Sequence, residues 1–402
     1  MKNRITKFLR TLGPGIITAA LILGPGTLTI ASKLGSQFQY QLLWVILLST
    51  IFMIAFTTMS ARFGFFNQKT LIETIRIRYG KYMSLLIGIS IFIVSISFQS
   101  GNSIGAGLSM GSIFNTTPQA WILLFSLIAI ITLFFRSFYK ILEKIMIVLV
   151  AIMLLSFLFT VIISSPDWGQ VLSGFVPKVP TGSEILSIAI VATSFSIAGA
   201  FYQSYLVQQK SWDKGNFNES RVESITGIVV LGLISSLVLI AAGSVLYTNG
   251  ISVNTAADMG KALEPLFGKA SFTIFMIGLF AASFSSLIGN ATLGGNILAD
   301  TLKLGTTHAN WSTRLLIMLL IVIGSSLAIA FSDLRLKLIV FAQGFTILIV
   351  PVIAFVMLNI FTGESIMGHQ KNSFLVRGIG FLGVALLTGL AIIYAYLIYF
   401  KN

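Results

Sequence analysis

Gly24-Pro25-Gly26-Thr27 interrupts the first long hydrophobic segment of the chain, which runs from about residue 11 to about residue 36. A proline between two glycines cannot continue the hydrogen-bond ladder of an α-helix, so backbone carbonyl and amide groups are left free. In a segment long enough to cross a bilayer, those groups must face protein or a cavity instead of lipid. Membrane transporters use broken helices of this kind as binding sites, so the sequence predicts a ligand site at this break.

The whole chain has the composition of an integral membrane protein. Of its 402 residues, 56% are hydrophobic and 9% are charged, and the mean hydropathy is +0.95. Apolar windows of about 20 residues, the length that spans a bilayer, recur throughout. We expect an all-α protein with eleven transmembrane helices, at about residues 11–36, 41–64, 83–110, 118–136, 143–163, 183–209, 224–248, 270–301, 313–331, 336–360 and 376–399. No soluble domain is left over, so we expect one transmembrane domain over residues 1–402.

The net charge of +14 follows the expected membrane topology. Lys and Arg cluster in alternate loops, which is how orientation in a membrane is encoded. This pattern predicts a cytoplasmic N-terminus and a C-terminus outside, in a bacterial inner (plasma) membrane. The basic residues then contact anionic lipid, and nucleic acid is not an expected partner. The first segment has no small-residue cleavage site, so we expect it to be kept as the first span.

Several chemistries are excluded by what the chain lacks. It contains no cysteine, which removes disulfides, thiolate metal ligands and thiol catalysis. No phosphate-binding loop or metal-ligand cluster occurs, and a Ser/His/Asp set cannot form inside the membrane without a histidine or carboxylate there. We therefore expect neither an enzyme nor a bound cofactor. The sequence leaves the oligomeric state open.

A second break is expected in the sixth segment. Small and β-branched residues and a glycine, at Ser194–Ala200, lie there between two apolar halves. Segments one and six are the first members of two successive groups of five, and interruptions at corresponding positions mark an inverted repeat. We expect repeat one at about 11–163, repeat two at about 183–360 and an extra helix at 376–399.

No carboxylate is expected near the middle of a span, and both histidines, His308 and His369, fall in predicted loops. A bare divalent cation at that depth needs charged or soft ligands, and proton coupling needs a group that titrates. The chain offers neutral polar groups instead: Thr27, Thr29, Gln99, Asn102, Thr193, Ser194, Ser196, Gln203, Asn290 and Gln343. Taken singly, each is more often a helix-to-helix hydrogen bond than a ligand. Together with two breaks they could coordinate a neutral solute, a monovalent ion, a partly hydrated divalent ion or an anion.

Motifs along nearly the whole chain resemble those of the Nramp family (natural resistance-associated macrophage protein) of divalent metal transporters. They include Leu12-Gly13-Pro14-Gly15, the Gly24-Pro25-Gly26 break, Gly35–Trp44, Ser60-Ala61-Arg62-Phe63-Gly64, Leu142-Glu143, Pro166–Leu172, Leu206-Val207-Gln208, Gly278–Ser286, and Gln343 with Pro351. The resemblance implies two inverted five-helix repeats of the LeuT-like type, with discontinuous helices 1 and 6. It also implies inward transport of manganese, iron and similar ions, usually with protons.

The site residues of the family are mostly replaced here. Gly24 stands at the position of the family's metal-binding aspartate, and Thr27 at that of its asparagine. Ser196 replaces a methionine and Ala198 a histidine. Gln343 is retained, as is the backbone carbonyl that belongs to Thr193. The resemblance thus implies a substrate site at Gly24, Thr27, Thr193, Ser196, Ala198 and Gln343, with no charged metal ligand.

The positions that carry protons in the family are also neutral. Gln99 and Asn102 replace an acidic pair in the third span, and Gln203 replaces a second histidine in the sixth. Some relatives that lack the methionine and the proton-coupling groups carry magnesium, an ion that sheds water reluctantly. This chain is similar to those, although it lacks their aspartate as well.

Three functions remain open from the sequence. The first is secondary transport of a divalent metal cation by alternating access, with the ion partly hydrated and coupled weakly or not at all to protons. The second is transport of a small neutral or zwitterionic organic solute on the same scaffold. The third is a membrane sensor that does not transport.

Overall fold

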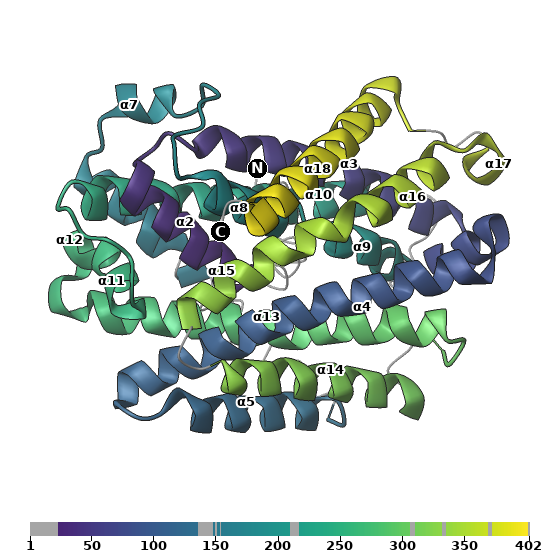
Figure 1. Cartoon of the computed structure of the whole chain (residues 1–402), viewed down its shortest axis with the longest axis horizontal. Helices are drawn as coiled ribbons and strands as arrows, with labels where there is room; N and C mark the ends of the chain where they lie inside the picture. Colours follow the sequence, from purple (N-terminus) through teal and green to yellow (C-terminus); the bar gives the residue numbers. More distant parts are fainter. Residues whose placement is uncertain are drawn as a thin grey trace, which may run out of the picture.

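The computed structural model describes residues 23–135, 148, 151–152, 154–209, 217–305, 310–331, 335–368 and 372–400. Within these ranges the secondary structure is helical, without an assigned strand (Figure 1). The α-helices are α2 (Pro25–Phe38), α3 (Leu43–Phe66), α4 (Leu71–Phe114), α5 (Pro118–Thr132), α7 (Trp168–Ser173), α8 (Glu184–Ser194), α9 (Ile197–Gln209), α10 (Phe217–Ala242), α11 (Ala256–Gly260), α12 (Glu264–Phe267), α13 (Ser271–Thr301), α14 (Trp311–Ala330), α15 (Arg335–Phe345), α16 (Val350–Thr362), α17 (Glu364–Met367) and α18 (Phe374–Phe400). Short 3-10 and π segments join some of them: η2 (Gly243–Tyr247), η3 (Lys261–Leu263), η4 (Gly268–Ala270) and η6 (Thr346–Leu348).

Seven described helices are long and apolar enough to cross a membrane, and an eighth span results if a bent pair counts as one. The bent pair is Lys337–Leu348 with Val350–Thr362, at 46°. Three further predicted segments correspond to shorter helices, namely α2, α5 and Leu154–Ser164. The first half of segment one, residues 11–22, and part of segment five lie outside the described residues. The count of eleven and the repeat arrangement therefore stay predictions.

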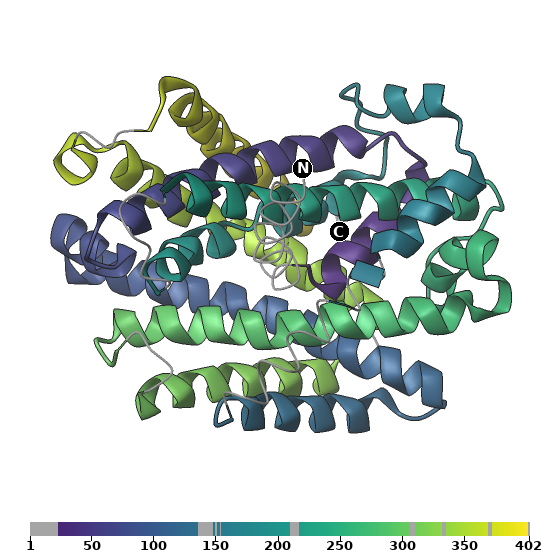
Figure 2. The same cartoon turned by 180° about the vertical axis from the view of Figure 1, so that it is seen from behind.

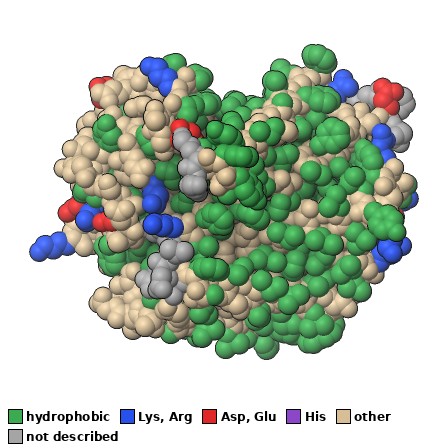
Figure 3. Space-filling model, viewed as in Figure 1, with side chains coloured by type: hydrophobic (Ala, Val, Ile, Leu, Met, Phe, Trp, Pro, Cys, Tyr) green, Lys and Arg blue, Asp and Glu red, His purple; other side chains and the backbone are tan. Residues whose placement is uncertain are grey.

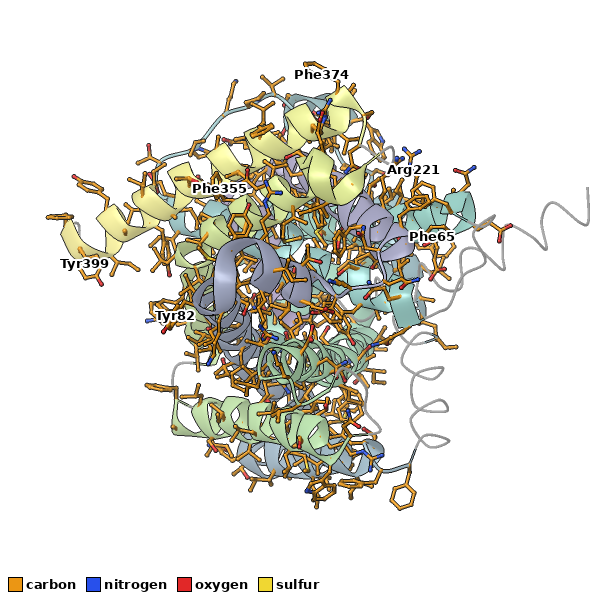
Figure 4. The ribbon with its side chains drawn as sticks, turned by 90° about the vertical axis from the view of Figure 1, so that its right-hand side faces the viewer. Phe65, Tyr82, Arg221, Phe355, Phe374 and Tyr399 are labelled. Carbon is orange, nitrogen blue, oxygen red and sulfur yellow. The ribbon has the colours of Figure 1, made fainter. Side chains whose placement is uncertain are left out.

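The surface of the molecule matches lipid. In Figure 3 hydrophobic side chains cover the middle of the long axis, while charged side chains gather toward its two ends. Figure 4 looks along that axis, and Tyr82, Phe374 and Tyr399 lie at its periphery and point outward. These three aromatic side chains are among the most exposed apolar residues of the chain. A broad apolar surface of this kind is stable in a bilayer and would favour aggregation in water.

The long helices pack as two groups (Figures 1 and 2). One, which we call the α13 group, contains α4, α5, α13 and α14; the other, the α3 group, contains α2, α3, α8, α9 and α10. Glycines let backbones approach closely within each group: a Cβ on Gly64 would lie 2.3 Å from the Ser204 carbonyl oxygen, and one on Gly294 would lie 2.6 Å from the Ser95 Cβ. The α15–α16 pair contacts both groups, which meet each other where α2 and α9 pack against α4 and α13.

Two bends were not predicted from the sequence. Helix α4 contains a kink at Gly80, whose φ of 85° favours glycine, so residues 71–79 form a separate helical stretch before the third predicted span. The Thr70 hydroxyl caps this stretch by accepting a hydrogen bond from the Glu73 amide at 3.1 Å. The second bend separates α15 from α16 just before Pro351, which cannot donate a helical hydrogen bond.

Candidate functional site

The first break coincides with the start of α2. Gly24 has extended backbone angles (φ −104°, ψ 172°), and Pro25 occupies the first helical turn, where its missing N–H costs nothing. The free amides of a helix N-terminus carry partial positive charge, and they point here toward the middle of the molecule. Because residues 11–22 lie outside the described residues, the structure shows one side of the predicted break in helix 1.

The second break separates α8 from α9. Helix α8 ends at Ser194, Phe195 has non-helical angles (φ −101°, ψ 63°), and α9 begins at Ile197. The break therefore lies within the predicted stretch Ser194–Ala200 but is narrower than it, because Gly199 is already part of α9. Ser196 explains the difference: its Oγ accepts a hydrogen bond from the Gly199 amide at 3.3 Å, which caps α9 and restarts the helix before the glycine.

The two breaks meet at an internal cavity of about 70 Å³. Eight residues predicted from the sequence line it: Gly24, Thr27, Asn102, Thr193, Ser196, Ala198, Gln203 and Gln343. The ninth, Gln99, does not line it. Its Oε1 accepts a hydrogen bond from Asn290 Nδ2 at 3.1 Å, so Gln99 lies behind Asn290 and supports that side chain.

The lining carries no formal charge. It contains hydroxyls, amides and backbone groups, and neither an acidic nor a basic side chain nor a histidine lies among the described residues that form it. Likewise, the described part of the chain holds no group of three or more His, Cys, Asp or Glu residues suited to a metal ion. Thr193 belongs to the last turn of α8, where carbonyls lack a helical partner, so its carbonyl oxygen is available to a ligand.

Gln343 is the side chain best placed to bind a ligand. It is 1% exposed, and its Oε1 has no hydrogen-bond partner among the described residues. Leaving a buried amide oxygen unpaired costs free energy, so such a group calls for a function. A Cβ on Gly26 would lie 2.8 Å from Gln343 Nε2, which explains why the break needs its second glycine.

The α13 group supplies part of the lining that sequence reasoning assigned elsewhere. Ser286 ends the Gly278–Ser286 run quoted above for its family resemblance; its Oγ donates to the Leu23 carbonyl at 2.7 Å, and the residue lines the cavity. A Cβ on Gly24 would lie 3.1 Å from Asn102 Oδ1. The remaining lining residues are Gly26, Phe98, Gly199, Tyr202, Leu206, Gly289, Asn290 and Leu293. Asn290 was among the neutral polar groups that the sequence offered, and Gly26 and Gly199 belong to the two predicted breaks, whereas the others gave no signal beyond packing.

The cavity extends from the breaks toward one end of the molecule. Along α9 it follows Ala198, Tyr202 and Leu206, and along α13 it follows Ser286 and Leu293. Both helices run toward the end that holds loops 67–70 and 302–305, which the charge pattern predicts to be cytoplasmic. Figure 2 shows α13 crossing the whole length of the molecule beside this region.

Sequence comparison identifies relatives over almost the entire chain. The family model described as natural resistance-associated macrophage protein-like matches residues 15–397. The chain is 26% identical over 389 residues to the divalent metal cation transporter MntH of Staphylococcus haemolyticus, covering 91% of this chain and 87% of the relative. It is also 26% identical over 408 residues to MntH of Chromohalobacter salexigens, with 97% and 91% covered.

Structural comparison gives the same fold. The manganese transporter of Eremococcus coleocola matches with a TM-score of 0.82 at 22% identity, covering 98% of this chain and 88% of that one. Mhp1, a nucleobase-cation-symport-1 family transporter, matches with a TM-score of 0.65 at 13% identity, covering 96% and 90%. This confirms the predicted all-α membrane transporter fold. The proteins named here are transporters and not enzymes.

Proposed function

Because the chain belongs to the Nramp (natural resistance-associated macrophage protein) family, we propose that it carries a divalent metal cation across the membrane by alternating access. The relatives named MntH are divalent metal cation transporters, and the Eremococcus coleocola protein transports manganese. The substrate site comprises Gly24, Thr27, Thr193, Ser196, Ala198 and Gln343. Asn102, Ser286 and Asn290 complete it from the α13 group.

The observation that carries this proposal is the neutral, oxygen-rich cavity between the two breaks. Gln343 Oε1 and the last carbonyls of α8 offer oxygen ligands, which hard cations prefer. Without a carboxylate, these ligands do not repay full dehydration of a divalent ion. The cargo therefore keeps part of its water shell, and magnesium or manganese fits this description better than softer metals, which favour sulfur and imidazole.

The size of the cavity also favours an ion. A water molecule needs about 10–15 Å³ of such space, so 70 Å³ holds on the order of five waters. That is enough for a cation with part of its shell. An organic solute much larger than about five non-hydrogen atoms fits only if the two helix groups separate.

Transport in this scheme is coupled weakly or not at all to protons. The family's acidic pair and second histidine correspond here to Gln99, Asn102 and Gln203, none of which titrates. Gln203 is further committed to a hydrogen bond, since its Nε2 donates to Ser224 Oγ at 2.7 Å. The proposed topology has one domain of eleven spans in two inverted repeats plus an extra helix, with the N-terminus cytoplasmic and the C-terminus outside.

A second candidate cargo is a small neutral or zwitterionic organic solute. The observation in its favour is the start of α2, where free backbone amides beside Thr27 could receive a carboxylate while Ser196 supplies a hydroxyl. Mhp1, on the same fold, binds a hydantoin. Against this, Pro25 removes one of the amides, and the cavity is small.

Flux into proteoliposomes distinguishes the two cargoes. We expect saturable uptake of manganese or magnesium, and about a tenfold loss with Gln343→Ala or Thr27→Ala, equivalent to one lost charge–dipole contact. Asn359→Ala is the matched control, because Asn359 lies on α16 outside the cavity lining and donates to its own helix at Phe355. Saturable uptake of an organic solute with no ion flux would overturn the first proposal, and a panel silent for organic solutes would exclude the second.

A further inference from the structure

Two polar contacts join α9 to α13 beside the inner part of the cavity. The Tyr205 hydroxyl donates to Asp300 Oδ2 at 2.6 Å, and Asn296 Nδ2 donates to the Tyr202 hydroxyl at 2.8 Å. The two tyrosine rings stack, with centroids 5.9 Å apart and an interplanar angle of 18°. Tyr202 itself lines the cavity, as does Leu206, so on α9 these contacts lie alongside the inner part of the cavity, and on α13 they lie beyond its last lining residue, Leu293.

These contacts connect the two helix groups. Helix α9 belongs to the α3 group and α13 to the α13 group, and the cavity lies between them. Opening the cavity toward this end requires α9 to move away from α13. That movement must break the Tyr205–Asp300 and Tyr202–Asn296 hydrogen bonds, so we name the Tyr205–Asp300 contact the inner latch.

Asp300 is held by groups from three directions. Tyr205 approaches from α9, the Thr70 hydroxyl bonds to the carboxylate from the loop before α4, and Arg76 and Glu73 act on it by charge from the first part of α4. Arg76 is fixed in turn, because it donates to the Thr301 carbonyl and to Ser84 Oγ. Asp300 is thus a carboxylate built into the inner end of the molecule, next to a cavity whose described lining contains none.

The strength of the latch depends on the charge of Asp300. A hydrogen bond from a hydroxyl to a carboxylate is roughly twice as strong as one from a hydroxyl to a neutral acceptor. Adding a proton to Asp300 removes that charge, and it also removes the attraction of Arg76. The strength of the Tyr202–Asn296 hydrogen bond has no such dependence on a carboxylate charge, because it joins a neutral hydroxyl to a neutral amide.

We propose that Asp300 is a proton-binding site that controls closure of the inner end: ionised, it holds α9 against α13 through Tyr205, and protonated, it lets them separate. The proton comes from and returns to the aqueous phase at that end. The proposal rests on the proposed function only because it requires a cavity that opens inward. It gives the protein a response to internal pH, which the uncharged cavity lining does not provide.

The natural absence of cysteine makes a direct test possible. Ala198→Cys places one thiol in the cavity lining, and its reaction with a membrane-impermeant maleimide in inside-out vesicles reports inner opening. We expect labelling about tenfold faster with Asp300→Asn or Tyr205→Phe at about pH 7.5, as fits the loss of one charge-assisted hydrogen bond. Tyr205→Phe keeps the stacked ring and serves if Asp300→Asn fails to fold. Tyr40→Phe, a buried tyrosine at the other end, is the matched control.

The pH dependence separates the latch from a merely structural contact. The ratio of the labelling rate with Asp300 intact to that with Asp300→Asn, measured in the same buffer, cancels the titration of the thiol. We expect this ratio to rise toward one as the pH falls from about 7.5 to about 5.5. A ratio that stays constant, or a reporter that remains unlabelled in both variants, would overturn the proposal. Labelling needs no transported ion, so this experiment can support or contradict the Asp300 proposal whatever the flux experiments show.

Discussion

The cavity between the helix breaks and the inner end just beyond it differ in where they place charge. The cavity lining is neutral, and one of its amide oxygens, on Gln343, lacks a partner. The inner end concentrates Asp300 and Arg76, and both are hydrogen-bonded. The difference indicates two separate roles: the region that meets the cargo keeps an unpaired dipole, and the region at the inner end uses hydrogen-bonded charged groups.

The strongest way to break this contrast is to put a charge into the cavity. Gly24→Asp should raise manganese affinity about 100-fold, or 2.7 kcal/mol, because a carboxylate about 4 Å from a divalent ion gains more Coulomb energy than its burial costs. The variant should also lose affinity as the pH falls and the carboxylate is protonated. Binding is measured by isothermal titration.

Gly24→Asn is the matched control for this change, since it adds the same volume close to Asn102 Oδ1 without charge. We expect it to bind no better than the natural chain. Equal affinities in Gly24→Asp and Gly24→Asn would show that the ion binds elsewhere.

A double-mutant cycle sharpens the contrast at the inner end. Tyr205→Phe and Asp300→Asn should show a coupling free energy of about 2 kcal/mol in thermal or denaturant unfolding, as expected for a buried hydrogen bond to a charged group. The neutral pair nearby, Tyr202→Phe with Asn296→Ala, should couple by about 1 kcal/mol. Equal coupling in the two cycles would contradict a special role for the Asp300 charge.

Replacing each of two cavity glutamines by methionine should change the stability of the protein in opposite directions. Gln343→Met removes a buried oxygen that has no partner, so we expect the free energy of unfolding to rise by about 1 kcal/mol while ion binding is lost. Gln203→Met breaks the hydrogen bond to Ser224 and should lower the free energy of unfolding by a similar amount. The measurement is the unfolding temperature without ligand. A loss of stability in both variants would mean that Gln343 is paired in the folded protein.

The smallest effect is expected at the second break. Ser196→Ala removes the cap of α9 at Gly199 and should cost about 1 kcal/mol of stability. Ser196→Thr keeps the oxygen and should cost less. If alanine and threonine behave alike, the hydroxyl does not restart the helix, and another contact must define the break.

The sequence predicted the membrane fold and the first break because both depend on local rules. Apolar windows report burial in lipid, and Gly24-Pro25-Gly26 cannot continue a helix whatever surrounds it. The second break was placed too broadly, since the hydroxyl that ends it, on Ser196, acts through a single contact to Gly199 that composition does not encode.

The α13 side of the cavity and the inner latch could not be predicted in the same way. Asn290 was offered by the sequence as a neutral polar group, but Ser286 lies among small residues that also fit ordinary packing, and its role depends on the face of α13 that meets Leu23. Asp300 lay near a span end in the sequence, where carboxylates are common. Its pairing with Tyr205, 95 positions away, exists only after the two helix groups assemble.

The most direct test of the central claim is anomalous scattering from crystals of the natural chain soaked in millimolar manganese. The account predicts one peak between Gly24–Thr27 and Thr193–Ser196, within ligand distance of Gln343 Oε1 and surrounded by water and neutral oxygens. An empty cavity at that concentration, or an ion held by a carboxylate at any other place, would contradict it.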